Sequence, residues 1–204
     1  MKYIKMLGLA AVAAMALMAF VGVGSASAVT LCENDTATGC TSHVNSGATI
    51  DFSAEDSIKL AGPFGITIDT CTESTVQGTT STTGTDNATA IAGTVTSLTF
   101  GKCTRLTTVG TGGTLSITES GTAGNGTVTS NGATVTIHEI PSPFPSTCAY
   151  STSNTDIGVL THNATAATFD ISATITHETA NCPDGTWSGH YVSTGPTVVK
   201  AVAH

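Results

Sequence analysis

Histidine beside a carboxylate is the combination in this chain that could support acid–base chemistry. It occurs as His138-Glu139 and as His177-Glu178. Both pairs end segments in which apolar and polar residues alternate, and adjacent residues on a strand point to opposite faces. Without a bulge, the members of each pair cannot converge, so we interpret His138 as a surface residue and His177 as a half-buried rim residue. The motifs of serine hydrolases, zinc proteases, phosphate loops and dinucleotide sites are missing from the sequence.

Carboxylates offer two further kinds of chemistry. A carboxylate pair for glycoside hydrolysis stays open as an alternative, because its members can lie far apart in sequence. Sugar-cleaving clefts need several aromatic platforms, however, and the chain holds one Trp and three Tyr. Calcium is the metal that fits best, since several aspartates lie in or beside turns, but no complete oxygen-ligand loop is present. We therefore predict no cofactor. The alternative is a bound calcium ion, for which the candidate ligands are Asp35, Asp69, Asp86, Asp156 and Asp184.

Six cysteines are the next residues whose spacing carries chemistry. Their even number favours disulfides over a metal or a catalytic thiol. Cys40 and His43 have ligand-like spacing, but nothing nearby supplies the second pair of a tetrahedral zinc site. Six cysteines allow 15 connectivities. Of these we predict sequential pairing, which joins Cys32 with Cys40, Cys71 with Cys103, and Cys148 with Cys182.

Trp187 and Tyr191 are the candidate binding residues. With Gly189 they occupy one face of a predicted strand near the C-terminus. If that face is exposed, the two rings form a platform for a glycan or a partner protein. If it is buried, Trp187 is a core residue beside the Cys182 bridge, and we favour burial.

The elements that must position these residues are strands. Between 166 and 177, Phe169, Ile171, Ala173 and Ile175 share one parity, which predicts a strand with one buried face. Asn131-Gly132 predicts a type I′ turn, and hence a hairpin over 127–136 that pairs Val128 with Val135. Further strands are predicted over 48–52, 57–61, 64–70, 90–100, 105–109, 114–120, 147–151, 157–161, 186–192 and 197–202.

This strand pattern predicts an all-β fold. About a dozen short strands with no helix between them favour an antiparallel two-sheet sandwich or jelly roll, stapled by disulfides. Threonine occurs 41 times, and its branched Cβ suits pleated strands. Loops are predicted over 78–87 and 141–145. A membrane-inserting hairpin over 114–140 is disfavoured because its outward band has few apolar residues.

The first 28 residues have the features of a cleaved signal peptide. Lys2 and Lys5 precede an apolar run from 6 to 23, and small residues lead to a predicted cut after Ala28. The predicted mature chain, 29–204, is long enough for one domain. It contains four Lys and Arg residues and 14 carboxylates. Removal of the two leader lysines therefore lowers the net charge from −8 to −10. Such acidity argues against nucleic acid and anionic membranes as partners.

Near the C-terminus, Cys182-Pro183 is followed by a predicted aromatic strand with Trp187 and Tyr191. With the signal peptide and the Thr/Gly-rich strands, the chain resembles a loose group of uncharacterised secreted β proteins from high-GC Gram-positive bacteria. The resemblance implies a secreted β-fold and assigns no catalytic residue. We therefore predict a secreted, non-enzymatic extracellular β-domain with a structural or binding role. Its partner would be an extracellular protein or glycan, without stable membrane insertion. The alternative is a secreted hydrolase acting on polysaccharide or peptide.

Overall fold

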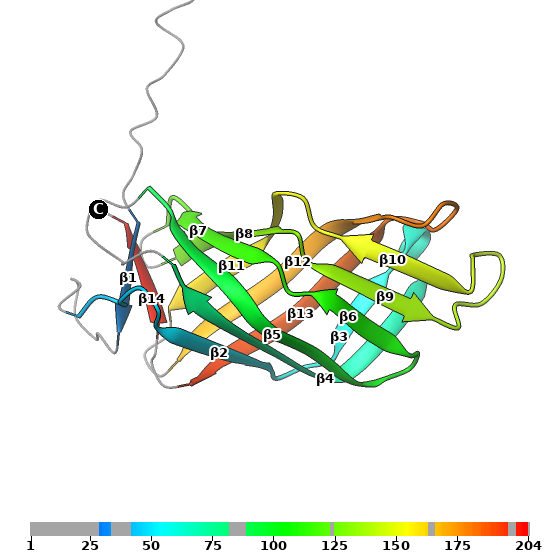
Figure 1. Cartoon of the computed structure of the whole chain (residues 1–204), viewed down its shortest axis with the longest axis horizontal. Helices are drawn as coiled ribbons and strands as arrows, with labels where there is room; N and C mark the ends of the chain where they lie inside the picture. Colours follow the sequence, from blue (N-terminus) through cyan, green and yellow to red (C-terminus); the bar gives the residue numbers. More distant parts are fainter. Residues whose placement is uncertain are drawn as a thin grey trace, which may run out of the picture.

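Antiparallel strands make up most of the structure. The computed structural model describes residues 29–33, 42–81, 89–122, 125–162, 166–195 and 199–203, which form an elongated body (Figure 1). The expected signal peptide, 1–28, lies outside the described residues. Within them the model contains a short 3-10 helix, η1 (Pro63–Gly65), and no helix long and apolar enough to cross a membrane.

Four long strands run the length of the body, and shorter strands placed end to end complete the wall. The long strands are β4 (Thr67–Thr80), β5 (Ile91–Cys103), β12 (Ala167–His177) and β13 (Gly185–Gly195). Each remaining wall position is shared by two strands. These pairs are β2 (Thr49–Ala54) with β3 (Ile58–Ala61), β7 (Thr114–Glu119) with β6 (Thr107–Thr111), β8 (Asn125–Asn131) with β9 (Thr134–His138), and β11 (Thr155–His162) with β10 (Thr147–Ser151).

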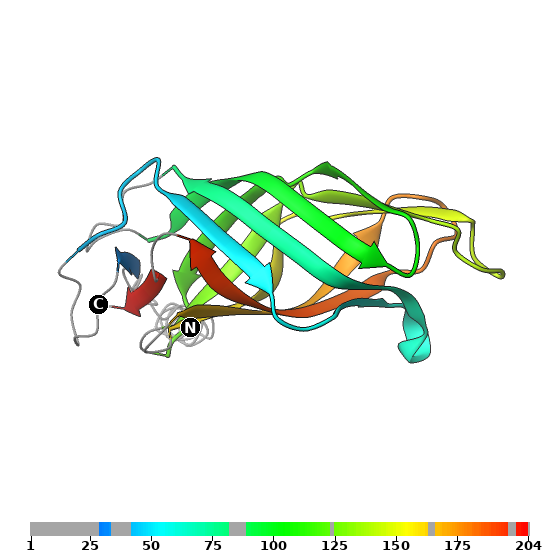
Figure 2. The same ribbon diagram turned by 90° about the horizontal axis from the view of Figure 1, so that it is seen from below.

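The sheet closes into a barrel. Eight strands pair in the ring β2–β4–β5–β7–β8–β11–β12–β13, and β13 pairs again with β2. Figure 2 shows the strands crossing the body obliquely around this ring. The expected all-β, antiparallel and disulfide-containing class is confirmed. The two-sheet sandwich or jelly roll is not what forms, because the β2–β4 and β12–β13 pairings join what would have been the edges of separate sheets.

The predicted hairpin over 127–136 is wrong. β8 pairs with β7 and β11, whereas β9 pairs with β6 and β10, so the two strands follow one another instead of folding back. Gly132 adopts a φ of 76°, as the turn prediction requires, but Thr152 intervenes. Its carbonyl accepts the Gly132 N–H at 2.8 Å, and its N–H donates to the Ala133 carbonyl at 3.0 Å. Asn131-Gly132 therefore bends a continuing wall strand.

The barrel interior has two apolar clusters, one in each half. The proximal half, built around β2, β7, β8 and β11, contains Phe169 and Ile171 on the predicted buried parity of β12. The distal half, built around β3, β6, β9 and β10, contains Ile175 from the same strand. Trp187 packs against both clusters. The alternation over 166–177 is therefore confirmed, and it spans both halves.

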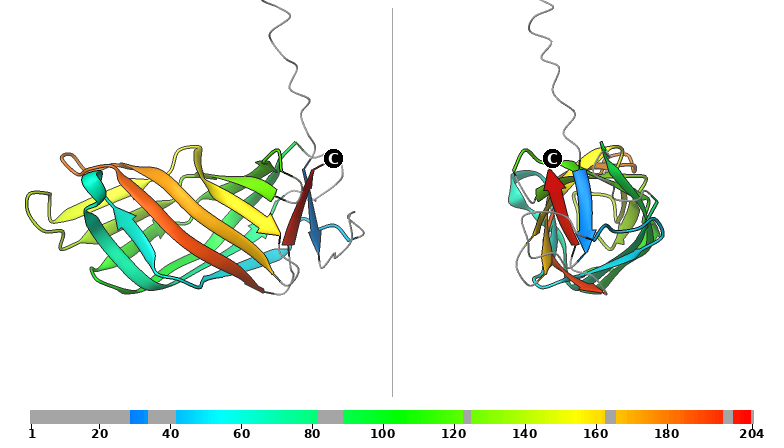
Figure 3. Two further views of the ribbon diagram at one scale, coloured as in Figure 1. Left: turned by 180° about the vertical axis from the view of Figure 1, so that it is seen from behind. Right: turned by 90° about the vertical axis from the view of Figure 1, so that its left-hand side faces the viewer.

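The first and last strands of the described residues meet beside the proximal half. β1 (Val29–Glu33) pairs in antiparallel fashion with β14 (Val199–Ala203), and the pair lies at the end of the barrel (Figure 3). Leu31 of β1 is fully buried and joins the proximal cluster. Its carbonyl accepts the Val44 N–H at 2.8 Å. β1 and β14 therefore cap one end of the barrel.

Disulfides link neighbouring parts of the distal half. Cys71 and Cys103 lie directly opposite each other on β4 and β5 and are bonded. Cys148 of β10 is bonded to Cys182 in the connection between β12 and β13. These two predicted pairings are confirmed. Cys32 is also disulfide-bonded, but its expected partner Cys40 lies outside the described residues, so this pairing stays a prediction. Disulfides of this kind form in oxidising compartments.

Candidate functional site

A cavity of about 60 Å³ lies inside the distal half of the barrel. Its wall is mainly apolar and draws on β3, β5, β9, β10, β12 and β13. A void of this size exceeds the roughly 10–15 Å³ that one water needs. A second cavity of about 70 Å³ lies in the proximal half beneath the cap, next to Leu31 and Leu115. The main lining side chains of the distal cavity are Leu60, Leu98, Phe100, Val135, Ile175 and Trp187.

Two residues that line the distal cavity carry a polar atom that is buried away from solvent. Tyr150 of β10 is fully buried, and its hydroxyl has no hydrogen-bond partner in the part of the chain that the structure describes. The indole Nε1 of Trp187, on β13, is likewise buried without a partner. Burial, and secondarily the charge of Asp184, raises the pKa of Tyr150 to about 12. The phenol therefore stays protonated at physiological pH and can donate a hydrogen bond.

An unpaired seam in the barrel wall borders this cavity. β7, which follows Gly113, pairs with β5. β6, which precedes Gly113, turns away from β5 and pairs with β9. In the described part of the chain, no ladder pairing joins β5 to β6. Gly113 has a φ of 69°, and an added Cβ would lie 2.4 Å from the Asn131 carbonyl oxygen, so the bend requires glycine. Leu98 and Phe100 of β5 are half-buried next to the seam.

Asp69 holds the turn between β5 and β6. The carboxylate is buried and lines the cavity. Its Oδ1 accepts hydrogen bonds from the Thr70 N–H at 2.8 Å, the Thr104 hydroxyl at 2.7 Å and the Arg105 N–H at 3.0 Å. Its Oδ2 accepts the Thr107 hydroxyl at 2.5 Å. Four donors thus compensate the buried charge and tie the start of β6 to β4.

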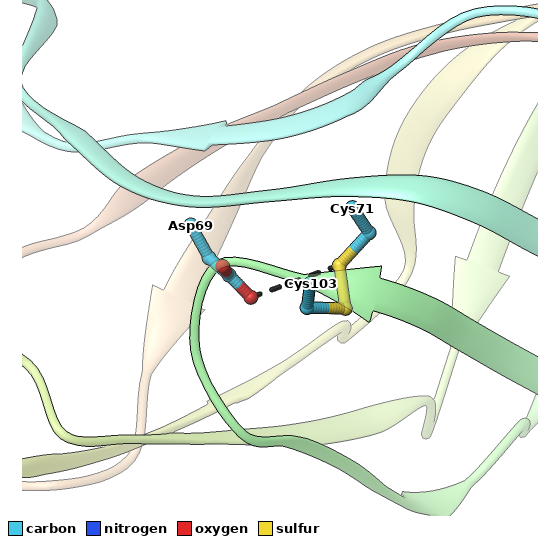
Figure 4. Close-up of side chains that lie close together, drawn as sticks. All are labelled: Asp69, Cys71 and Cys103. Atoms are coloured by element: carbon cyan, nitrogen blue, oxygen red, sulfur yellow. Dashed lines mark hydrogen bonds between the residues drawn. A yellow bond between two sulfur atoms is a disulfide. The ribbon is translucent and has the colours of Figure 1, made fainter.

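Asp69 also lies beside the Cys71–Cys103 disulfide (Figure 4). Among the described residues, these three side chains form the one group with metal-ligand spacing. Both sulfurs are bonded to each other, so neither is available as the thiolate that metals bind. The 3.7 Å approach of Cys71 Sγ to Asp69 Oδ2 is a contact, since an oxidised sulfur has no proton to donate. The group is a structural cluster.

The aspartates considered for calcium do not assemble into one site among the described residues. The Asp69 carboxylate already accepts four hydrogen bonds from protein donors. Asp156 accepts the Thr129 hydroxyl at 2.7 Å, and Asp184 bonds to His177 at 2.8 Å. Asp35 and Asp86 lie outside the described residues.

The histidine–carboxylate contacts link residues that are separated in sequence. His177 Nδ1 bonds to Asp184, which lowers the pKa of that carboxyl. His190 Nδ1 lies 2.5 Å from Asp170, its cross-strand neighbour, and Nε2 lies 3.7 Å from Glu55. The bond to Asp170 is the main cause that raises the pKa of His190. These contacts lie at the surface, and neither histidine lines the distal cavity.

The predicted binding residues face inward. Tyr191 is fully buried, and its hydroxyl donates to Ser74 at 2.9 Å, while Ser74 donates to the Thr99 carbonyl at 2.8 Å. Trp187 is half-buried and packs edge-on against Phe100, with ring centroids 6.0 Å apart. The pair therefore does not form an exposed platform. Trp187 belongs to the cavity wall, together with Tyr150, which the sequence reasoning did not select.

The alternating strand pattern could have indicated Tyr150, which shares the parity of Cys148 on a predicted strand. The cavity itself depends on which strands pair, and no local pattern specifies that. Comparison of the chain with protein-family models, curated proteins and solved structures finds no match.

Proposed function

We propose that this chain is a secreted, non-enzymatic binding protein that holds a small apolar group in the distal half of its barrel. The observation that carries the proposal is the apolar cavity beside an unpaired seam. Eight-stranded barrels enclose an interior wide enough for side chains or for one small ligand. Here the side chains leave part of the distal interior open, and the seam offers a route from the surface.

Secretion is supported by three features. The N-terminal segment has the composition of a signal peptide, the disulfides need an oxidising compartment, and the chain is acidic. The resemblance to secreted Thr/Gly-rich β proteins points the same way.

The cavity lining favours binding over catalysis. Asp69 is the one carboxylate among the lining residues, and four hydrogen-bond donors occupy it. No histidine lines the cavity, so it lacks the acid–base pair that the alternative, a hydrolase, requires. A small molecule is favoured over a glycan or a protein, because Trp187 and Tyr191 are turned inward and cannot anchor a large partner at the surface.

Ligand-induced stabilisation tests this proposal. We expect 2-methylpropene, a compact apolar molecule, to raise the Tm of the oxidised protein, because a ligand that binds the folded state stabilises it. Val135→Phe should abolish the increase by filling the distal cavity, and the milder Val135→Leu should reduce it. The matched control Leu115→Phe fills the proximal cavity instead and should retain the increase. The proposal is wrong if 2-methylpropene does not raise the Tm of wild type. It is also wrong if Val135→Phe and Leu115→Phe reduce the Tm increase equally.

A further inference from the structure

β6 forms one side of the seam beside the distal cavity, and only one of its edges is supported. It pairs with β9, and among the described residues no ladder pairing supports its other edge. β3, β9 and β10, the other short strands of the distal half, each pair along both edges. The β6–β9 ladder is also short, and its register shifts between Val109 and Thr111. Strands with few supporting hydrogen bonds open more readily than the rest of a structure.

The two ends of β6, in contrast, are fixed. At its start, the Asp69 carboxylate accepts hydrogen bonds from the Arg105 N–H at 3.0 Å and from the Thr107 hydroxyl at 2.5 Å. Beyond its end, the Val95 N–H donates to the Gly113 carbonyl at 3.0 Å, which brings the chain back to β5. β6 is therefore a strap that is held at both ends and free along one edge.

The cavity lining is partly exposed to solvent next to this strap. Leu98 and Phe100 on the β5 side of the seam line the cavity and are half-buried, as is Thr107 on the β6 side. Lining residues of strands away from the seam, such as Ile58 and Ile175, are buried. This pattern of exposure indicates that the cavity opens toward the seam.

The two ends of the barrel are less suited to be entrances. The proximal end is covered by β1 and β14, and its own apolar cluster lies between that end and the distal cavity. At the distal end, the Cys148–Cys182 bond ties the connection between β12 and β13 to β10, and Ile140 is buried in the same cluster. The seam is therefore the shortest break in the wall through which a molecule can reach the cavity.

We propose that β6 gates the distal cavity, and that small neutral molecules enter between β5 and β6 when β6 separates from β9 and swings outward about its two fixed ends. This inference rests on the proposed function, because it describes how the ligand of that cavity enters and leaves. Only the short β6–β9 ladder has to open, so the paired strands and both described disulfides keep their places. Motions of this kind commonly control access to enclosed sites.

Fluorescence quenching of Trp187 by acrylamide, a small neutral molecule, tests the gate. The chain has a single tryptophan, and it lines the cavity and packs against Phe100. In the double variant Thr99→Cys/Thr108→Cys, a bifunctional maleimide joins the two sides of the seam. The described cysteines include no free thiol, so the reagent is directed to the introduced pair. We expect this cross-link to remove most of the dynamic quenching that wild type shows.

The matched control is the double variant Thr75→Cys/Thr99→Cys, treated with the same reagent. It shares Thr99, but Thr75 lies directly opposite on β4, where the strands are already paired. Thr75, Thr99 and Thr108 are all exposed, so the substitutions remove no buried side chain. We expect the control cross-link to leave the quenching of Trp187 unchanged.

Amide hydrogen exchange of the unmodified protein provides a measurement that needs no variant. β9 pairs with β6 along one edge and with β10 along the other. If β6 opens on its own, the amides in the β6–β9 ladder exchange faster than those in the β9–β10 ladder. Equal protection of the two ladders would overturn the inference.

The quenching experiment has two further outcomes that would overturn the gate. One is quenching of Trp187 that is unchanged by the cross-link across the seam, or absent in wild type. The other is an equal loss of quenching in the control between β4 and β5. Failure of the proposed function is a separate result, because it would appear as the absence of a Tm increase with 2-methylpropene while acrylamide still enters through the seam.

Discussion

At the scale of single residues, the two buried tyrosines differ in whether their hydroxyls are hydrogen-bonded. Tyr191 contributes a satisfied hydrogen bond between β13 and β4, whereas the Tyr150 hydroxyl has no hydrogen-bond partner among the described residues. An unsatisfied buried polar group costs about 1–3 kcal/mol.

The first prediction follows from that contrast. Without ligand, Tyr150→Phe should leave the free energy of unfolding unchanged or raise it by about 1 kcal/mol, because it removes an unpaired hydroxyl. Tyr191→Phe should lower it by about 1 kcal/mol or more, because the mutation leaves Ser74 without its donor. Urea denaturation of the oxidised variants measures both values. Equal destabilisation by the two changes would show that Tyr150 is satisfied in solution.

The second prediction concerns pH. The bond from Asp170 raises the pKa of His190 above its unfolded value of about 6.5. The contact therefore stabilises the fold fully below about pH 6.5, and this contribution disappears as the pH rises through the folded pKa. The effect is small, since both side chains are partly exposed. Asp170→Asn should lower the pKa of His190 in an NMR titration, whereas Asp156→Asn should not. An unchanged His190 pKa in Asp170→Asn would contradict the contact.

At the scale of elements, Asp69 is the residue that fixes the seam. It connects β4 to the turn between β5 and β6, where no ladder pairing supports the wall. In the sequence, Asp69 lies beside a predicted turn, which made it a candidate ligand for calcium. The structure assigns its oxygens to four protein donors instead. The turn position could be read from the sequence, but three of the four donors lie 35 to 38 residues away, and only the barrel brings them together.

The third prediction tests that connection. Asp69→Asn should lower the free energy of unfolding by about 2 kcal/mol or more, because an amide has one acceptor oxygen and no charge with which to hold the four donors. It should also speed amide hydrogen exchange at Arg105, whose N–H donates to Asp69. Asp156→Asn, which alters an exposed carboxylate with a single hydroxyl partner, is the control. Similar losses in both variants would contradict a special role for Asp69.

The strands also show what local sequence can and cannot determine. The alternation over 166–177 predicted the buried residues of β12, because period-two patterning reports directly which face is buried. Asn131-Gly132 predicted the backbone conformation of Gly132 but not its partner, because Thr152 takes the hydrogen bonds that a hairpin would use. The same limit explains the expected sandwich, since burial patterns are alike whether two sheets stack or one sheet closes.

At the scale of the whole molecule, the barrel combines a rigid frame with an incompletely filled interior. The Cys71–Cys103 and Cys148–Cys182 bonds strengthen the distal half, where the cavity lies, and the β1–β14 pair caps the opposite end. Binding inside a stapled barrel needs little reorganisation of the protein, which reduces the entropy lost on binding.

The fourth prediction belongs to this scale. The intact mass of protein secreted by its own host should be lower by six hydrogens than that of the reduced mature chain, since we predict that the six cysteines form three disulfides. The same spectrum should place the N-terminus at Val29. Two or more free thiols in natively folded material would contradict the predicted third bond, and a retained leader would contradict secretion by cleavage.

The central claim is that a small apolar group binds inside the distal half of the barrel. Intermolecular NOE contacts test it most directly, because the chain contains a single tryptophan and that residue lines the cavity. We predict contacts from the methyl protons of 2-methylpropene to the Trp187 indole ring in wild type and in Leu115→Phe, and their loss in Val135→Phe. Absence of these contacts in wild type, or contacts confined to the proximal residues Leu31 and Leu115, would contradict the claim.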